Sequence, residues 1–205
     1  MTPDIKCLFL DIGGVLLTNG WDHDIRKHVA KHFNIESTDM EYRHHLTFGT
    51  YEEGKISLEE YLNRVVFYKP RPFTQAEFQR FMFDQSKPFP EMIDLISRLK
   101  AKYGLKITVV SNEGRSLNEY RIRKYRLDQL VDTFISSCYI RVRKPDTQIF
   151  QLAIDISQVS PENVVYIENT EMFVQIAQGL GIRCILHTGY ASTYEALSSF
   201  GLMEK

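Results

Sequence analysis

Short apolar segments recur along the chain, and segments with helical spacing lie between them. The first apolar segment is Cys7–Leu10, and Asp11 ends it. Four later segments complete a set of expected strands, at residues 106–110, 133–136, 164–167 and 183–186. Strands that alternate with helices favour a parallel sheet covered by helices on both faces. The pattern therefore predicts an α/β fold.

Helical periodicity in four segments supports this alternation. One helix is expected to begin at Pro90, with an apolar stripe from Met92 to Tyr103. The other three are expected at residues 116–127, 146–156 and 171–180. Apolar residues three and four positions apart form the stripe by which a helix packs on its neighbours, so these helices are expected to cover the sheet.

One long interval, from about residue 18 to residue 87, shows helical patterns only. Asp22 is placed to cap a helix, and Ser57 and Thr74 each begin a capping box with a glutamate three residues later. A helical block inserted after the first strand predicts two domains. Residues 1–17 and 88–205 would form the α/β core, and residues 18–87 a small all-helical cap over a strand-end site.

The composition of the chain mainly argues against certain classes of function. The chain has 205 residues, a net charge of −1 and three cysteines that form no CxxC pair. A near-neutral chain shows no electrostatic footprint for nucleic acid or an anionic membrane, and no apolar run is long enough to span a bilayer. The basic run from Arg121 to Arg126 is interpreted as a solvated helix face. Separated cysteines and the lack of a secretory signal predict a cytoplasmic protein, whose oligomeric state is left open.

Polar side chains follow four of the five expected strands. Asp11 comes directly after the first strand and Ser111 after the second, while Lys144 follows the third and Glu168 the fourth. The carboxyl ends of parallel strands meet at one edge of a sheet, where α/β proteins bind ligands, so these side chains are expected to converge. A hydroxyl and an ammonium suit a phosphate group, and two carboxylates suit Mg²⁺.

Four short motifs contain these residues. They are Phe9-Leu10-Asp11-Ile12-Gly13-Gly14-Val15, Val110-Ser111-Asn112, Arg143-Lys144-Pro145-Asp146 and Val165-Tyr166-Ile167-Glu168-Asn169. In this order, with a helical insertion after the first, the motifs resemble the haloacid dehalogenase-like (HAD) superfamily, in members that carry an α-helical cap. The resemblance covers nearly the whole chain and implies a Rossmann-like core.

The resemblance also implies a role for each matching residue. In most of the family the first aspartate attacks phosphorus, and water then hydrolyses the aspartyl phosphate in the presence of Mg²⁺. By this resemblance Asp11 would be the nucleophile, and Ser111 and Asn112 would bind phosphate. Lys144 would anchor both the phosphate and Asp11.

Two positions depart from the family pattern. Gly13 stands where family phosphatases carry an aspartate that acts as general acid and base, a function worth roughly 10²–10⁴-fold in rate. Its backbone carbonyl, which the family uses as a Mg²⁺ ligand, is kept. Asn169 stands where a metal-binding aspartate is often found. The implied ligands are then Asp11, the Gly13 carbonyl, Glu168 and Asn169, and Mg²⁺ is expected to bind weakly because the Asn169 amide is neutral.

The sequence thus predicts a Mg²⁺-dependent phosphatase of small phosphorylated metabolites, with Asp11 and Lys144 as catalytic residues. Because position 13 lacks an acid, esters whose leaving group departs without a proton are expected to react fastest. Trp21 and Asp22, which lead from the first motif toward the cap, are candidate substrate contacts. Asp22 is also a candidate proton donor.

Two other functions stay open. A non-catalytic HAD-fold protein that binds a phosphorylated ligand or a partner would tolerate both departures. A 2-haloacid dehalogenase, in which the carboxylate displaces halide from carbon, would need neither Mg²⁺ nor the second aspartate. That branch of the family, however, carries an aspartate in the fourth motif where this chain has Phe173.

Overall fold

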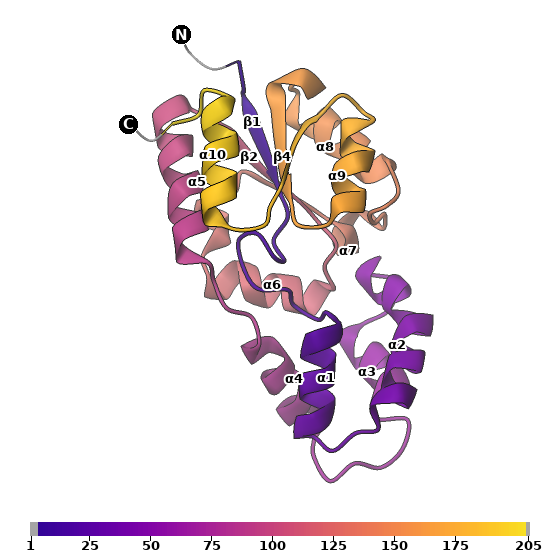
Figure 1. The fold of residues 1–205 in the computed structure, drawn as a ribbon. Helices are drawn as coiled ribbons and strands as arrows, with labels where there is room; N and C mark the ends of the chain where they lie inside the picture. Colours follow the sequence, from indigo (N-terminus) through magenta and orange to yellow (C-terminus); the bar gives the residue numbers. More distant parts are fainter. Residues whose placement is uncertain (1–3, 204–205) are drawn as a thin grey trace.

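The computed structural model describes residues 4–203. Five parallel strands form one sheet in the order β3-β2-β1-β4-β5, with β1 at its centre (Figure 1). The strands are β1 Cys7–Leu10, β2 Lys106–Ser111, β3 Thr133–Ser136, β4 Val164–Glu168 and β5 Arg183–Leu186. The predicted α/β, Rossmann-like class is confirmed. Leu10 of β1 pairs with Val109 on one side and Ile167 on the other, so the three central strands end at the same level.

Ten helices surround and extend this sheet within the described residues. They are α1 His23–His32, α2 Ser37–Glu52, α3 Leu58–Val65, α4 Gln75–Asp84, α5 Pro90–Tyr103, α6 Arg115–Lys124, α7 Ser137–Ile140, α8 Gln148–Ser157, α9 Glu171–Gln178 and α10 Tyr190–Ser199. Two short 3₁₀ turns lie at Leu127–Gln129 and Pro161–Asn163. The helices expected from Pro90 onward are confirmed, with ends shifted by a few residues, whereas α7 and α10 have no counterpart among them.

The two faces of the sheet carry separate cores because successive side chains of a strand point to opposite sides. Leu8 and Leu10 of β1 join one hydrophobic cluster with α5 and α10. Cys7 and Phe9 join the other with α8 and α9. All four side chains are fully buried. Burial on both faces explains why the strand reads as a continuous apolar run.

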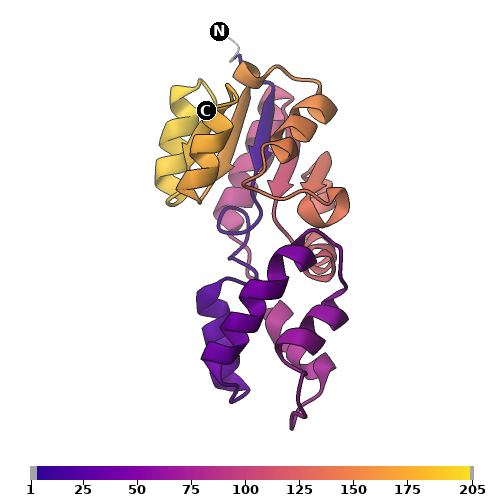
Figure 2. The ribbon, with the colours of Figure 1, turned by 90° about the vertical axis from the view of Figure 1, so that its right-hand side faces the viewer.

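Helices α1–α4 pack on one another at the end of the molecule opposite the two chain termini (Figures 1 and 2). Asp22 caps α1 by accepting a hydrogen bond from Ile25 N (2.9 Å), and both predicted capping boxes are present. Their hydrophobic cluster also takes in Leu117 of α6. The division into residues 1–17 with 88–205 and residues 18–87 stays an interpretation of this packing.

The two connections to this helical block run side by side. Thr18 N donates to Lys87 O (2.8 Å) and Lys87 N donates to Thr18 Oγ1 (3.0 Å).

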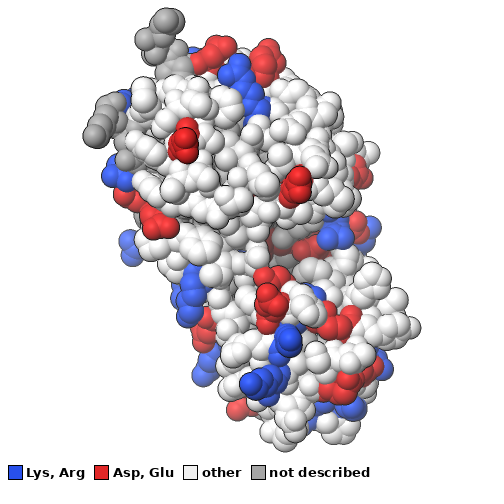
Figure 3. Space-filling model, viewed as in Figure 1, with Lys and Arg blue, Asp and Glu red and all other residues white. Residues whose placement is uncertain are grey.

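Acidic and basic side chains are interspersed on the face over α1 and α2 (Figure 3). Across residues 4–203, none of the helices combines the length and apolar character needed to cross a membrane.

Candidate active site

Asp11 lies just beyond β1, at the edge of the sheet where the strands end. Its main-chain N–H donates to Ile167 O (3.1 Å), which extends the pairing with β4 by one residue. Its carboxylate oxygen Oδ1 accepts from Ile12 N (2.9 Å). The side chain is nearly buried, and what remains exposed faces a cavity. The backbone therefore fixes the carboxylate at a strand mouth, as expected for a reacting group.

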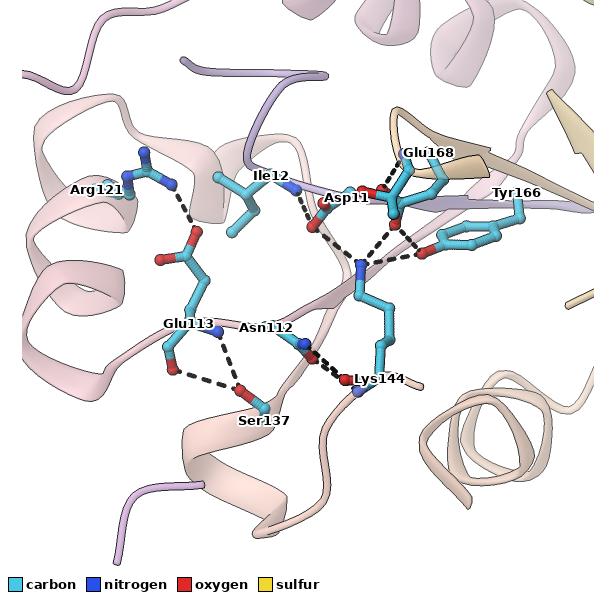
Figure 4. A network of polar contacts seen from close by, with 10 residues as sticks. Asp11, Ile12, Asn112, Glu113, Arg121, Ser137, Lys144, Tyr166 and Glu168 are labelled. Carbon is cyan, nitrogen blue, oxygen red and sulfur yellow. Dashed lines mark hydrogen bonds and ion pairs between the residues drawn. The ribbon is translucent and has the colours of Figure 1, made fainter. Parts of the chain in front are cut away.

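Lys144 lies in the loop between α7 and α8, and its side chain extends to the carboxylates at the strand ends (Figure 4). Its Nζ lies 2.6 Å from Glu168 Oε2, 3.1 Å from Tyr166 Oη and 3.4 Å from Asp11 Oδ1. The Tyr166 hydroxyl also donates to Glu168 Oε2. Lys144 is 1% exposed, so one buried ammonium holds two carboxylates together. The structure thus brings together Asp11, Lys144 and Glu168, which the sequence places at three different strand ends.

The charges in this cluster do not cancel. Burial, and next the charge of Glu168, raise the pKa of Asp11 to about 7, although Lys144 opposes the rise. Burial lowers the pKa of Lys144, but the two carboxylates outweigh it and the net shift is upward. With all three groups ionised, the cluster carries one excess negative charge. An uncompensated buried charge is costly, so the cluster favours an additional cation.

Ser111 and Asn112 follow β2 and lie beside Asp11 in the same cavity. The buried Ser111 hydroxyl is close enough to Asp11 to lower its pKa, yet it makes no well-formed hydrogen bond to any described residue. A buried hydroxyl without a partner is rare and is available to a ligand. The Asn112 side chain is engaged, because Nδ2 donates to Lys144 O (2.9 Å) and Oδ1 accepts from Lys144 N (2.8 Å). Any contact of Asn112 with phosphate would have to come from its main chain.

The turn after Asp11 brings Gly13 and Gly14 against Asn169. Gly14 has φ +74°, and a Cβ at this position would lie 2.1 Å from the Asn169 amide. Glycine is therefore required there by conformation and by close approach. Gly13 does not have a positive φ, and a Cβ would meet Asn19 Oδ1 at 3.3 Å. A side chain at position 13 thus needs only a small adjustment of its neighbour.

The Asn169 amide tests whether these residues fit a cation. Turned one way, its nitrogen donates to Glu168 Oε1 (2.9 Å) and to the Gly13 carbonyl (3.3 Å). Turned the other way, its oxygen faces the same two oxygens, and three oxygens then gather with no donor between them. That arrangement suits a hard cation, which takes carboxylate and carbonyl oxygens. Without a cation the first orientation is favoured, because it satisfies the amide, so the residues predicted as metal ligands fit Mg²⁺ only if the Asn169 amide turns to the second orientation.

The same geometry explains why such a site would be weak. No group of three or more His, Cys, Asp or Glu side chains able to hold a metal exists in residues 4–203, so neutral oxygens must complete the ligand set. Glu168 is fully buried, and its two oxygens already accept from Lys144, Tyr166 and Thr170 N. Asp11 and Gly13 line one cavity, whereas Asn169 lines a separate one, so the four expected ligands do not share a single cavity.

The cavity that Asp11 lines lies between the sheet edge and the helical block and measures about 220 Å³. Two of its sides are referred to below as walls. The sheet wall is formed by Asp11, Gly13, Ser111, Asn112 and Glu113. The helical wall is formed by Arg26 of α1, Phe48, Tyr51 and Glu52 of α2, and Met82 of α4. A cavity of this size suits a small metabolite better than a large ligand.

Trp21 and Asp22, predicted as substrate contacts, both line this cavity. Trp21 is buried, and its Nε1 donates to Tyr61 Oη (2.8 Å). The Asp22 carboxylate accepts from Ile25 N as the cap of α1. Both side chains therefore stabilise the local structure. To deliver a proton, Asp22 would have to break its hydrogen bond with Ile25 N.

A second buried ion pair flanks the site and escaped the sequence interpretation. Arg121 Nη1 lies 2.5 Å from Glu113 Oε1. The same guanidinium donates to Ser86 Oγ (3.0 Å) and to Thr18 O (2.6 Å). Thr18 lies in one of the two connections to the helical block. The expectation of a solvated basic face is wrong for Arg121, which is fully buried. Helical spacing alone could not show this, because the partner carboxylate lies in the loop after β2.

Two residues of the helical wall were also missed. Tyr51 packs its ring on Gly114, where a Cβ would lie 2.1 Å from the ring, and its buried hydroxyl has no partner among residues 4–203. Glu52 is buried, with Oε2 2.7 Å from Arg143 Nη2. Burial raises the pKa of Glu52 to about 7, although Arg143 opposes it. A Tyr-Glu-Glu run at a helix end gives no sequence signal that distinguishes these side chains.

An open parallel sheet with a carboxylate and a lysine at its strand ends belongs to the α/β proteins that react or bind beyond the carboxyl ends of their strands. The model of the family "haloacid dehalogenase-like hydrolase" matches residues 5–181. The chain belongs to this hydrolase family.

Individual relatives are more distant. The phosphorylated carbohydrates phosphatase of Thermotoga maritima is 26% identical over 133 residues, which is 65% of this chain and 57% of that protein. The (S)-2-haloacid dehalogenase 4A of Burkholderia cepacia is 23% identical over 87 residues, covering 42% of this chain and 37% of that protein. The chain thus spans little more than half of one curated relative and less of the other.

Among solved structures, the HAD family enzyme bt-2542 of Bacteroides thetaiotaomicron, in complex with magnesium and inorganic phosphate, aligns with a TM-score of 0.74. It is 20% identical, and the alignment covers 88% of this chain and 93% of that one. At this level of identity the likeness shows the fold.

Proposed function

We propose that this chain is a Mg²⁺-dependent phosphatase that hydrolyses small phosphorylated metabolites through an aspartyl phosphate on Asp11. One observation carries the proposal. The Asp11 carboxylate at the mouth of β1 shares a cavity with the Ser111 hydroxyl, which makes no well-formed hydrogen bond within residues 4–203, and Lys144 Nζ lies 3.4 Å from Asp11 Oδ1. A nucleophile, a hydrogen-bond donor and a fixed positive charge are the groups that phosphoryl transfer needs.

Each residue has a distinct part in this reaction. Asp11 would attack phosphorus, and Ser111 would donate a hydrogen bond to a phosphoryl oxygen. Lys144 would orient Asp11 and favour its ionised form. Asn112 positions Lys144 through the two hydrogen bonds between its side chain and the Lys144 main chain.

Asp11, the Gly13 carbonyl, Glu168 and Asn169 would hold Mg²⁺. Bound there, the ion would neutralise charge on the phosphoryl oxygens. The excess negative charge of the Asp11–Lys144–Glu168 cluster supports this assignment. So do the Mg²⁺ and phosphate in the complex of bt-2542 and the name of the Thermotoga relative.

Dehalogenation is the second candidate, because a curated relative bears that name. The geometry favours it less. At position 173, where the dehalogenase branch carries an aspartate, the Phe173 ring centre lies 5.0 Å from Lys144 Nζ. An apolar ring offers the lysine a cation–π contact and supplies no carboxylate.

The test is a panel of phosphate esters with Mg²⁺, run on the parent and on Asp11→Asn, with 2-chloropropionate as a separate substrate. We expect phosphate release that falls by about 10⁴-fold or more in Asp11→Asn, as for the loss of a nucleophile. Chloride release would favour the dehalogenase instead. Binding of phosphate without turnover of any ester would establish a non-catalytic binding protein.

A further inference from the structure

Position 13 has no side chain to protonate a leaving group, so a proton donor must come from elsewhere in the cavity. In the proposed reaction the phosphoryl group would lie against the sheet wall, and the leaving group would then point toward the helical wall. Three carboxylic acids besides Asp11 line the cavity: Asp22, Glu52 and Glu113. Their surroundings separate them.

Asp22 and Glu113 are committed to other partners. Asp22 caps α1 through Ile25 N at 2.9 Å. Glu113 Oε1 lies 2.5 Å from Arg121 Nη1, in an ion pair that also holds a connection to the helical block. Neither could release or accept a proton without disturbing the packing.

Glu52 differs from both. Its main chain is fixed to the core because Ser137 Oγ donates to Glu52 O (2.8 Å). Its side chain is buried and faces the cavity; Oε2 also pairs with an arginine, Arg143, but this guanidinium is 35% exposed, whereas the Arg121 that holds Glu113 is fully buried. The neighbouring Tyr51 hydroxyl, buried without a partner among the described residues, lines the same wall. This hydroxyl is available to a polar leaving group.

We infer that Glu52 is the general acid of this site and that it protonates the leaving oxygen of alkyl phosphate esters, such as sugar or polyol phosphates. The inference rests on the proposed phosphatase activity. It places the proton donor in the helical block instead of two residues after the nucleophile.

The step balances as follows. An Asp11 oxygen bonds to phosphorus while the bond between phosphorus and the ester oxygen breaks. The electron pair of that bond goes to the ester oxygen, which takes the Glu52 proton and leaves as an alcohol. Glu52 is then ionised beside Arg143. A water molecule next attacks the aspartyl phosphate and gives a proton to Glu52, which restores both carboxyl groups and releases phosphate.

The charges around Glu52 suit this cycle. Burial, together with the charge of Glu113, disfavours the ionised form, whereas Arg143 and Lys144 favour it. The resulting pKa of about 7 keeps the group protonated in mildly acidic solution and able to ionise in the reaction. Ionisation of Asp11, whose pKa is also about 7, affects all esters alike. Because the acid form of Glu52 is the active one, kcat/KM for poor leaving groups, relative to p-nitrophenyl phosphate, should fall as the pH rises through about 7.

The experiment measures kcat/KM with Mg²⁺ for glycerol phosphate, whose leaving group needs a proton, and for p-nitrophenyl phosphate, whose leaving group does not. In Glu52→Gln we expect glycerol phosphate to lose about 10²–10³-fold and p-nitrophenyl phosphate about threefold or less. The matched control is Glu53→Gln, which alters the neighbouring glutamate paired with Lys55 on the surface; both substrates should keep their parent values.

Equal losses on the two esters would overturn the inference and make Glu52 a positioning residue that acts through Arg143. No loss on either would overturn it as well. In both cases turnover that requires Asp11 leaves the phosphatase proposal standing, whereas absence of Asp11-dependent turnover ends both. If Glu52→Gln does not fold, Arg143→Gln serves instead. Removing the positive charge of Arg143 should raise the Glu52 pKa and move the fall of kcat/KM to higher pH. A pH dependence of kcat/KM equal to that of the parent would count against Glu52.

Discussion

The two walls of the cavity are built on different principles. The sheet wall is charged, and its groups are held by one another and by the ends of neighbouring strands. Lys144 alone binds two carboxylates (Figure 4). The helical wall comes from three helices and combines the Phe48 and Tyr51 rings with Arg26, Glu52 and Met82; its Tyr51 hydroxyl lacks a partner within the described part of the chain. The difference separates two tasks: the sheet wall would perform phosphoryl transfer, and the helical wall would select and protonate the leaving group.

The same contrast appears in the two buried ion pairs beside the site. The Asp11–Lys144–Glu168 cluster, with all three groups ionised, carries an excess negative charge, which a bound metal cation would balance. The Glu113–Arg121 pair is neutral and adds hydrogen bonds to Ser86 and Thr18. A neutral pair with its hydrogen bonds satisfied stabilises a particular packing, whereas a cluster with uncompensated charge is poised for a ligand.

The largest expected effect comes from removing the charge that holds the sheet wall. Lys144→Met leaves the Asp11 and Glu168 carboxylates buried without their cation. We expect a loss of about 3–5 kcal/mol in the free energy of unfolding, as for other broken buried pairs, measured by urea denaturation. The control is Lys100→Met, which breaks a partly exposed pair with Asp132 at a similar distance of 2.6 Å and should cost about 1 kcal/mol or less. Equal losses would show that burial adds nothing at Lys144.

The next effect tests the division of labour directly. In the parent, Gly13→Asp should change glycerol phosphate turnover little, because Glu52 already supplies the proton. In Glu52→Gln it should restore about 10–100-fold of the lost kcat/KM. The φ of Gly13 permits an aspartate, but Arg121 Nη1 lies 4.0 Å from the position of its Cβ and would attract the new carboxylate. Rescue is therefore expected to be partial. Equal gains in both backgrounds would mean that Glu52 and position 13 act independently.

Asn169→Asp addresses the weak cation site and should tighten Mg²⁺ binding about tenfold, or about 1.4 kcal/mol, because a charge replaces a dipole. The new carboxylate would stand close to Glu168 Oε1, which the present amide meets at 2.9 Å. Without Mg²⁺ the variant should therefore be less stable than the parent, and Mg²⁺ should reverse this. Calorimetry and thermal unfolding with and without Mg²⁺ measure both effects. Identical Mg²⁺ affinities would exclude Asn169 as a ligand.

The smallest effect separates two stacked tyrosines of the helical block, Tyr51 and Tyr61, whose ring centres lie 4.9 Å apart. The Tyr61 hydroxyl accepts from Trp21 Nε1 and lies 2.8 Å from His44 Nδ1. Tyr61→Phe should therefore lose about 1–2 kcal/mol of stability. Tyr51→Phe removes a hydroxyl that has no partner among residues 4–203 and should stay within about 0.5 kcal/mol of the parent. A stability loss from Tyr51→Phe as large as that from Tyr61→Phe would show that the Tyr51 hydroxyl is already satisfied.

The sequence by itself determined the α/β class, the five strands and the strand-end groups. Asp11, Ser111 and Glu168 each stand at the end of an apolar run, and parallel strands bring their carboxyl ends to one edge. Their approach needs no knowledge of packing beyond the sheet. The position of Gly13 likewise showed that an acid was missing at the usual place.

Only the tertiary structure decided which residues form the wall of the cavity that faces the sheet edge. Glu52 and Tyr51 belong to a helix that packs on α7 and Gly114 and places them in the wall of the cavity that Asp11 also lines, and their spacing in the sequence does not indicate this. Arg121 lies in a basic run typical of a surface, but a carboxylate from another loop draws it inside. The sheet edge follows from local pattern because hydrogen-bonded strands repeat at a fixed spacing. The facing helices meet it through side-chain packing over long sequence separations, which no local pattern encodes.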